Sequence, residues 1–188
     1  YPCRYQGRLR TGDTDAYGGP SATPTVDPGT RLVWTLSIDG DLRCWDANQS
    51  GAPVWGLNLH ERFRIAQRPD VGGGRRDFGS AGSPLLFGED LVVEVGAAEA
   101  WLVAFDKRTG AVAWRTAFSV PAGHTSGPVP LTVEGTPCLA GLALEALHLV
   151  RTDPGHEGAE LWQVPWTTDF ACNIPTPVVT DAGVLVTS

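Results

Sequence analysis

Three aspartates stand in the same local setting, and each carboxylate has the chemistry of a general base or a metal ligand. Each is followed by a glycine four or five residues later and by a tryptophan four residues after the glycine. The copies are Asp46, Gly51 and Trp55; Asp106, Gly110 and Trp114; and Asp153, Gly158 and Trp162. Equivalent residues lie 59 or 60 and then 47 or 48 positions apart. Because the acid recurs with every copy, we interpret it as part of a structural repeat rather than as an active site.

The middle copy predicts a hairpin between two strands, at residues 101–106 and 111–116. Asp106 ends the first strand, and its carboxylate can accept hydrogen bonds from the N–H groups two and three residues further on. Gly110 supplies the positive φ that closes such a loop at low cost. Trp114 lies on the outgoing strand, where a buried indole removes ~150–250 Å² from water. We therefore expect the tryptophan to join one repeat to the next.

Repeats of this size, built from short strands and glycine turns, are typical of β-propeller blades, which stabilise one another by stacking. The middle copy also resembles the repeat of the pyrroloquinoline-quinone (PQQ)-like β-propeller family. The matching residues are Ala104, Asp106, Thr109, Gly110 and Trp114, which fill every defined position of that repeat. The outer copies have one extra loop residue, and they replace the alanine by Cys44 or Arg151 and the threonine by Ser50 or Glu157. The resemblance implies an all-β propeller of four-stranded antiparallel blades, in which the tryptophan docks on the glycine turn of an adjacent blade.

We expect a single propeller segment over residues 1–188, with about three blades and a partial fourth. Its parts are an interblade connection (1–21), a blade (22–58), an inserted Arg- and Gly-rich loop (59–80), two further blades (81–118 and 124–164) and a partial blade (174–188). Both ends are expected to fall inside blades, so that the missing blades of the ring lie elsewhere. The absence of any Met agrees with an excerpt from a longer protein.

Two stretches make specific strand predictions. Residues 137–150 are apolar, and their local propensity would allow a helix. The repeat frame instead predicts two strands, near residues 138–142 and 146–150. In the second blade, Leu91, Val93 and Val95 alternate with Val92 and Glu94. This alternation predicts a strand with one largely buried face.

Composition limits the classes of function. A net charge of −7 and a pI of about 5.0 argue against a nucleic-acid partner. No apolar run approaches the ~20 residues that span a bilayer. The four cysteines, at positions 3, 44, 138 and 172, allow three disulfide pairings, and no CxxC pair indicates structural zinc. Because Cys44 lies in a strand run and Cys138 in an apolar segment, we favour buried free thiols at these two positions.

The inserted loop is a candidate binding surface. Its arginines are Arg62, Arg64, Arg68, Arg75 and Arg76. They could form an anion-binding rim on an otherwise acidic protein, although a solvated insertion is the favoured interpretation. The Asp39-Gly40 pair with Asp41 is interpreted as a hairpin turn rather than a calcium loop. The histidines at positions 60, 124, 148 and 156 lack metal-ligand spacing, so structural or surface roles are expected.

These observations favour a noncatalytic binding or assembly scaffold, periplasmic or extracellular, whose partner is a protein or another ligand. The resembled family includes a propeller lipoprotein that assists outer-membrane β-barrel assembly and binds a partner through loops and strand edges. No catalytic residue, cofactor or metal site is predicted.

Two alternatives stay open. The first is a PQQ-dependent alcohol or sugar dehydrogenase whose quinone and calcium site lies outside these residues. The resemblance implies that such an enzyme uses adjacent cysteines, a metal ion and a catalytic aspartate, and no two cysteines are adjacent here. The second is a regulatory propeller fused to a kinase or another enzyme.

Overall fold

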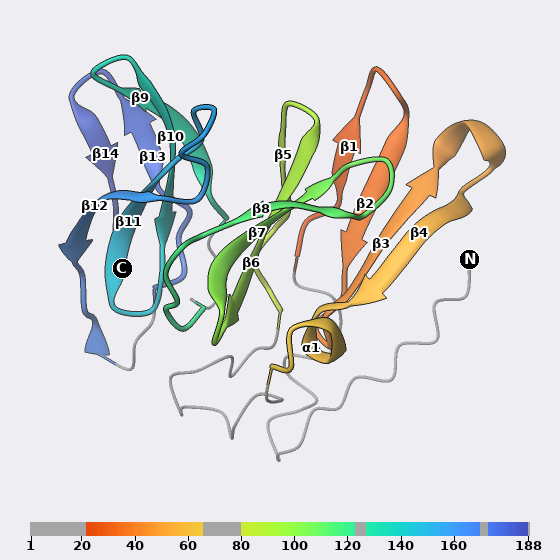
Figure 1. Cartoon of the computed structure of the whole chain (residues 1–188), viewed down its shortest axis with the longest axis horizontal. Coiled ribbons are helices and arrows are strands. Elements are labelled where there is room, and N and C mark those ends of the chain that lie inside the picture. The colour runs from red at the N-terminus through yellow and green to blue at the C-terminus, as the bar shows by residue number, and fades with distance from the viewer. Residues whose placement is uncertain (1–21, 66–79, 123–126, 170–172, 188) are drawn as a thin grey trace.

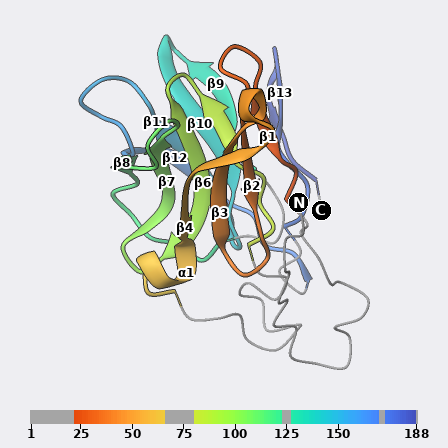
Figure 2. The same ribbon diagram turned by 90° about the vertical axis from the view of Figure 1, so that its right-hand side faces the viewer.

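The computed structural model describes residues 22–65, 80–122, 127–169 and 173–187. These residues form three four-stranded antiparallel sheets and one two-stranded sheet. Each strand pairs with the next one along the chain, as in a series of hairpins. Figure 1 shows the three four-stranded sheets side by side, in chain order from right to left, and Figure 2 gives the perpendicular view. The predicted fold class is therefore confirmed: the chain is a β-propeller segment with three blades and part of a fourth.

The bounds of the elements follow the repeat. The first blade contains β1 (Thr25–Asp27), β2 (Leu32–Leu36), β3 (Asp41–Asp46) and β4 (Ala52–Asn58). The second contains β5 (Leu85–Phe87), β6 (Asp90–Ala97), β7 (Ala100–Asp106) and β8 (Val112–Arg115). The third contains β9 (Val129–Val133), β10 (Thr136–Leu142), β11 (Ala146–Arg151) and β12 (Glu160–Pro165), and the two-stranded sheet contains β13 (Val178–Thr180) and β14 (Gly183–Leu185).

Tertiary pairing decides the conformation of the ambiguous apolar stretch. The strands expected at residues 138–142 and 146–150 are confirmed as β10 and β11, which pair with each other from Cys138↔Arg151 to Leu142↔Leu147. The segment after β4 was expected to be irregular from its start, and this expectation is wrong for its first turn. Residues Leu59–Arg62 form the short helix α1, whose first turn is capped by the Asn58 side chain accepting from the Glu61 N–H at 3.0 Å.

The core consists of three layers, each between two neighbouring sheets. Leu91 and Val93 of β6 face the first blade, where they pack with Trp34 and Leu42. Val92, on the opposite face, packs in a cluster that includes third-blade residues. β6 is therefore buried on both faces, and the expectation of a single buried face is wrong. The reason is that a blade inside the array has a neighbour on each side, which the alternation of one strand does not reveal.

The last layer is only partly covered. Ala140, Leu142 and Leu149 of the third blade pack with Val184 of β14 and with Val186 just after it. Apolar side chains beyond this cover are exposed, among them Trp162 at 52% and Leu185 at 63%. Among the described residues, the helical segments are all too short or too polar to traverse a lipid bilayer.

Candidate functional site

Asp106 closes the turn of the middle repeat copy with its own carboxylate. Its Oδ1 accepts hydrogen bonds from the backbone N–H of Arg108 at 3.1 Å, the N–H of Thr109 at 2.8 Å and the Thr109 hydroxyl at 2.7 Å. The Thr109 hydroxyl, followed by the Thr109 N–H, lowers the pKa of Asp106 below its ordinary value. Gly110 follows with a φ of +72° and donates its N–H to the Asp106 carbonyl at 2.9 Å. This carboxylate therefore stabilises the loop that carries it.

The two outer copies bind their aspartates differently. Asp46 accepts from the Asn48 N–H at 2.8 Å and from the Gln49 side chain at 2.7 Å, and these bonds lower its pKa. Asp153 instead forms two hydrogen bonds with the Arg151 guanidinium, at 2.8 Å and 2.5 Å, which are the main reason its pKa falls to about 2. Arg151 stands where the middle copy has alanine, so this copy replaces backbone donors with an ion pair.

The tryptophans of the three copies have different surroundings. A Cβ added to Gly110 would lie 2.7 Å from the indole of Trp55, so the first-blade tryptophan lies directly on the turn of the second blade. Trp114 is partly buried against the layer between the second and third blades, opposite the buried Ala104, and its Nε1 donates to Asp90 Oδ2 of its own blade at 2.9 Å. Trp162 is half exposed.

The glycines of the outer copies also adopt left-handed conformations, with φ of +76° at Gly51 and +85° at Gly158. A Cβ added to Gly158 would overlap the carbonyl group of Arg115. The Gly158 carbonyl also accepts from the Ala117 N–H at 2.9 Å. The turn of the third blade therefore lies on the backbone that follows Trp114, whereas the turn of the second blade lies on an indole ring.

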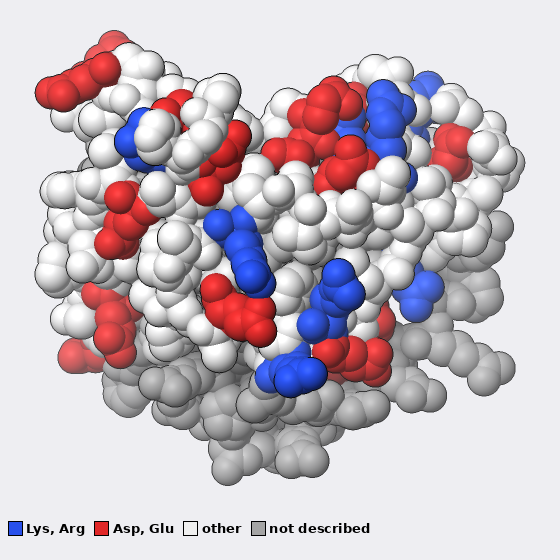
Figure 3. Space-filling model, viewed as in Figure 1, with Lys and Arg blue, Asp and Glu red and all other residues white. Residues whose placement is uncertain are grey.

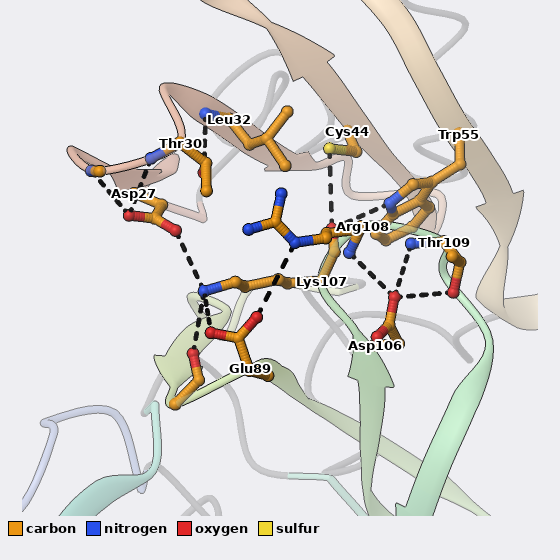
Figure 4. Close-up of polar contacts among 12 residues, drawn as sticks. Asp27, Thr30, Leu32, Cys44, Trp55, Glu89, Asp106, Lys107, Arg108 and Thr109 are labelled. Carbon is orange, nitrogen blue, oxygen red and sulfur yellow. Dashed lines mark hydrogen bonds and ion pairs between the residues drawn. The ribbon is translucent and has the colours of Figure 1, made fainter.

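Lys107, next to Asp106, binds the second blade to the first through its carbonyl (Figure 4). The carbonyl oxygen accepts from Trp34 Nε1 at 3.2 Å and from Trp55 Nε1 at 3.1 Å. The thiol of Cys44 lies 3.9 Å from the same oxygen. Three first-blade side chains thus converge on one backbone atom of the neighbouring turn.

The ammonium group of Lys107 makes a second set of contacts (Figure 4). It lies 3.2 Å from Asp27 Oδ2 in the first blade and 2.8 Å from Glu89 Oε1 in its own blade, and it donates to the Gly88 carbonyl at 3.2 Å. The Lys107 and Asp27 side chains are only 7% and 12% exposed, which excludes from this pair most of the water that weakens surface ion pairs, whereas Glu89 is 72% exposed. Its pKa is raised, chiefly by the hydrogen bond to Glu89.

Asp27 is held as a carboxylate by its own loop as well as by Lys107. The hydroxyl of Thr30, then the N–H of Gly29 at 2.9 Å, are the largest causes that lower the pKa of Asp27 to about 2. Sequence reasoning missed both Asp27 and Lys107. The only signal was the position of Lys107 directly after a motif aspartate, where the backbone of the turn meets the preceding blade.

An aromatic cluster joins the second and third blades. A Cβ on Gly141 would lie 2.6 Å from Cη2 of Trp101, so the indole reaches the surface of β10 at a residue without a side chain. Trp101 Nε1 donates to the buried Glu94 at 2.7 Å. The imidazole of His148 lies 5.1 Å from the Trp101 ring and 5.2 Å from the stacked Phe118 ring. Glu94 in an apolar strand was the available sequence signal for a buried partner.

The three histidines that the structure describes do not gather. His148 is buried, and its Nδ1 lies 2.7 Å from Glu160 Oε1. His60, also buried, lies 3.3 Å from the Ser80 hydroxyl, and His156 is an exposed neighbour of Asp153 at 3.0 Å. His124 lies outside the described residues.

The predicted arginine rim is described only in part. Arg62 and Arg64 are exposed, on and just after α1. Arg68, Arg75 and Arg76 lie outside the described residues. Figure 3 shows basic and acidic side chains interspersed over the visible face rather than gathered by sign.

Two of the four cysteines can be placed. Cys44 and Cys138 are both buried and free, as expected from their strand positions. Burial raises the pKa of Cys44 to about 11. Because one thiol belongs to the first blade and the other to the third, they do not form the adjacent cysteine pair expected under the dehydrogenase alternative. Cys3 and Cys172 lie outside the described residues.

Successive four-stranded antiparallel sheets, stacked face to face and joined through Asp/Gly turns, define this chain as a β-propeller repeat protein. The chain belongs to the PQQ_2 family, described as outer membrane protein assembly factor BamB, which matches residues 39–188. The resemblance identified from the repeat is thereby confirmed. A search of curated proteins gave no match.

Two solved structures with TM-scores above 0.5 share the fold, and a third is similar over a smaller part of its length. BamB from Moraxella catarrhalis is 19% identical, with a TM-score of 0.52 over 86% of this chain and 44% of that one. The computationally designed protein Ika8 is 11% identical, with a TM-score of 0.53 over 88% of this chain and 42% of that one. Quinohemoprotein alcohol dehydrogenase from Comamonas testosteroni is 17% identical, with a TM-score of 0.46 over 79% and 21%. This chain therefore spans less than half the length of each of these structures.

Proposed function

We propose that this chain is part of a noncatalytic propeller scaffold that binds a protein partner in the periplasm or outside the cell, within a larger ring of the same repeat. The observation that carries the proposal is that the carboxylate and ammonium groups at the turn of the second blade are engaged in structural contacts. Asp106 is bound by its own turn, and Lys107 joins the first two blades through both its carbonyl and its ammonium group. Groups that could do chemistry are thus committed to building the array.

Membership of the BamB family supports an assembly role. The family description names an outer membrane protein assembly factor. We infer from it that the partner is a polypeptide of the outer-membrane assembly process. Such a partner would bind the loops at one of the two ends of the blades, because the faces between blades are occupied by the core layers.

Photo-crosslinking tests this proposal on the two ends separately. Because hairpins alternate direction, the β9–β10 turn that carries Glu134 and the β10–β11 turn that carries Glu145 lie at opposite ends of the third blade. Both residues are exposed. A photoreactive residue placed at one or the other should give a discrete adduct with one envelope protein from one end only. Equal labelling from both ends, or none from either, would contradict a defined interface.

A catalytic assay tests the noncatalytic part. The buried Cys44 and Cys138 do not provide the adjacent pair expected of the quinone enzymes. The protein is incubated with PQQ and calcium, and dye reduction is followed with alcohols and aldose sugars. We expect no turnover above the rate without protein. Sustained turnover would replace the scaffold proposal with the dehydrogenase.

A further inference from the structure

A second repeat, distinct from the Asp/Gly/Trp turn, stands at the start of each blade. The first strand of every sheet begins at the residue after a proline: β1 after Pro24, β5 after Pro84, β9 after Pro128 and β13 after Pro177. Proline has no N–H to donate, so the nearest backbone donor on the amino side of each strand belongs to the residue before it. Those residues are Thr23, Ser83, Gly127 and Thr176.

These pre-proline residues are hydrogen-bonded from blade to blade. The N–H of Thr23 donates to the Ser83 hydroxyl at 2.9 Å. The N–H of Gly127 donates to the Thr176 hydroxyl at 3.4 Å. In both cases the donor is the pre-proline backbone of one blade, and the acceptor is the pre-proline side chain of the next. The first strands involved also contact each other, β1 with β5 and β9 with β13.

The junction between the second and third blades has no hydroxyl in the acceptor position. Gly127 has no side chain to offer the second blade. A Cβ built there would lie 3.1 Å from the Ser83 carbonyl oxygen and 3.9 Å from the Ser83 nitrogen. Gly127 therefore lies close to the Ser83 backbone but cannot accept a hydrogen bond with a side chain. The second and third blades keep the same arrangement without this hydrogen bond.

Whether the proline before each first strand is buried depends on whether a described blade precedes it. Pro84, Pro128 and Pro177 each have a described blade on the preceding side, and all three are buried. Pro24 begins the first described blade and is exposed, as is Thr23 beside it. Thr23 and Pro24 thus present, uncovered within the described residues, the surface that the later blades bury.

We propose that the pre-proline hydroxyl is a blade-to-blade joint, and that Thr23 and Pro24 form the docking surface for one further blade of the same repeat. That blade would place its own pre-proline N–H on the Thr23 hydroxyl and cover Pro24. The two joints already present identify the occupant. In each of them the donor is the backbone N–H of the residue before a proline, and it comes from the preceding blade. This inference rests on the proposed function only in that it requires a larger ring.

Hydroxyl deletions test the joint inside the chain. Ser83→Ala and Thr176→Val each remove one acceptor, and each should raise the equilibrium constant of unfolding by about 2- to 10-fold, the usual net effect of one hydrogen bond. Thr132→Val is the matched control, because Thr132 is exposed on β9 and its side chain makes no hydrogen bond within the described residues. Urea unfolding supplies the constants. If Ser83→Ala and Thr176→Val match Thr132→Val, the joint does not exist.

Thr23→Val tests the docking surface. In the 188-residue chain this variant should unfold like Thr132→Val, because the Thr23 side chain accepts no hydrogen bond among the described residues. In the protein as its own gene encodes it, Thr23→Val should shift the unfolding constant as Ser83→Ala does. No shift there would overturn the docking surface. These readouts measure stability alone, so they separate this inference from the crosslinking result that tests partner binding.

Discussion

The indole of Trp101 in the second blade occupies the space that a side chain at Gly141 of the third blade would fill, with 2.6 Å between Cη2 and a Cβ built on the glycine. Both residues lie in central strands of their sheets, β7 and β10. The gap in one sheet surface is therefore matched to the largest side chain of the other. This pairing fixes how the two blades sit against each other, and it leads to the first prediction.

Gly141→Ala should destabilise the protein by about 1–3 kcal/mol, because the added methyl overpacks the interface. Trp101→Phe shortens the intruding ring, so the double variant should recover part of the loss. Gly56→Ala is the control, since its Cβ would meet the flexible Arg43 side chain at 3.3 Å and the Leu42 carbonyl oxygen at an ordinary contact distance of 3.6 Å. Urea unfolding of the wild type, the two single variants Gly141→Ala and Trp101→Phe, and the double variant gives the coupling free energy. Additive effects would show that Trp101 and Gly141 do not interact in this way.

A second pair of glycines separates docking from backbone strain. Gly110 and Gly155 both have positive φ, +72° and +82°, but only Gly110 faces an indole, that of Trp55. Alanine at either site should cost roughly 1–2 kcal/mol from the left-handed backbone. Gly110→Ala should cost about 1–3 kcal/mol more, because its methyl displaces the ring. Equal unfolding midpoints for the two variants would contradict the dock.

The tryptophans of the repeat should differ in their effect on stability. Trp114 is partly buried and hydrogen-bonded to Asp90, whereas Trp162 is 52% exposed. Trp114→Ala should cost about 2–4 kcal/mol, somewhat below the usual range for a fully buried aromatic residue. Trp162→Ala should cost less than about 1 kcal/mol in this chain. Thermal and urea unfolding provide the comparison, and an unchanged melting temperature for Trp114→Ala would remove its structural role.

Asp27 makes stability depend on pH. Its pKa in the folded protein is about 2, below the value near 4 of an unfolded chain. The folded state therefore favours the carboxylate, and this contribution is present above about pH 4 and is lost as the pH falls from about 4 towards 2. Asp27→Asn should lower the urea midpoint at pH 6 and flatten its decline over that acidic range.

The control for this pH prediction is Asp181→Asn, at the exposed turn between β13 and β14. In this variant the urea midpoint should decline between about pH 4 and pH 2 as it does in the wild type. Asp153, whose pKa is also about 2, contributes separately to the loss of stability over this pH range. Asp27→Asn should therefore reduce the acid sensitivity of the urea midpoint without abolishing it. A curve for Asp27→Asn that parallels the wild type would show that the Asp27 carboxylate, with its bonds to Thr30, Gly29 and Lys107, does not stabilise the fold.

The amino-acid sequence by itself determined the local structure of each blade. Asp106 and Gly110 form their turn with neighbours only a few residues away, so residue type and spacing were sufficient to predict it. The period of the three copies was sufficient to predict the β-propeller and the strands β10 and β11. These features depend on contacts close in sequence, or on a pattern repeated along the whole chain.

Apart from the tryptophan that docks on a glycine turn, as Trp55 does on Gly110, only the tertiary structure decided which residues join the blades. Lys107 meets Asp27 across 80 positions of sequence, and Trp101 meets Gly141 across 40, counted from their residue numbers. Neither pair shares a motif, because each residue is suited to a surface that another blade supplies. The pre-proline hydroxyls show the same limit, since Ser83 and Thr176 are ordinary strand-entry residues until a neighbouring N–H is placed on them. Contacts between blades depend on how whole sheets stack, which the spacing of residues within one blade does not specify.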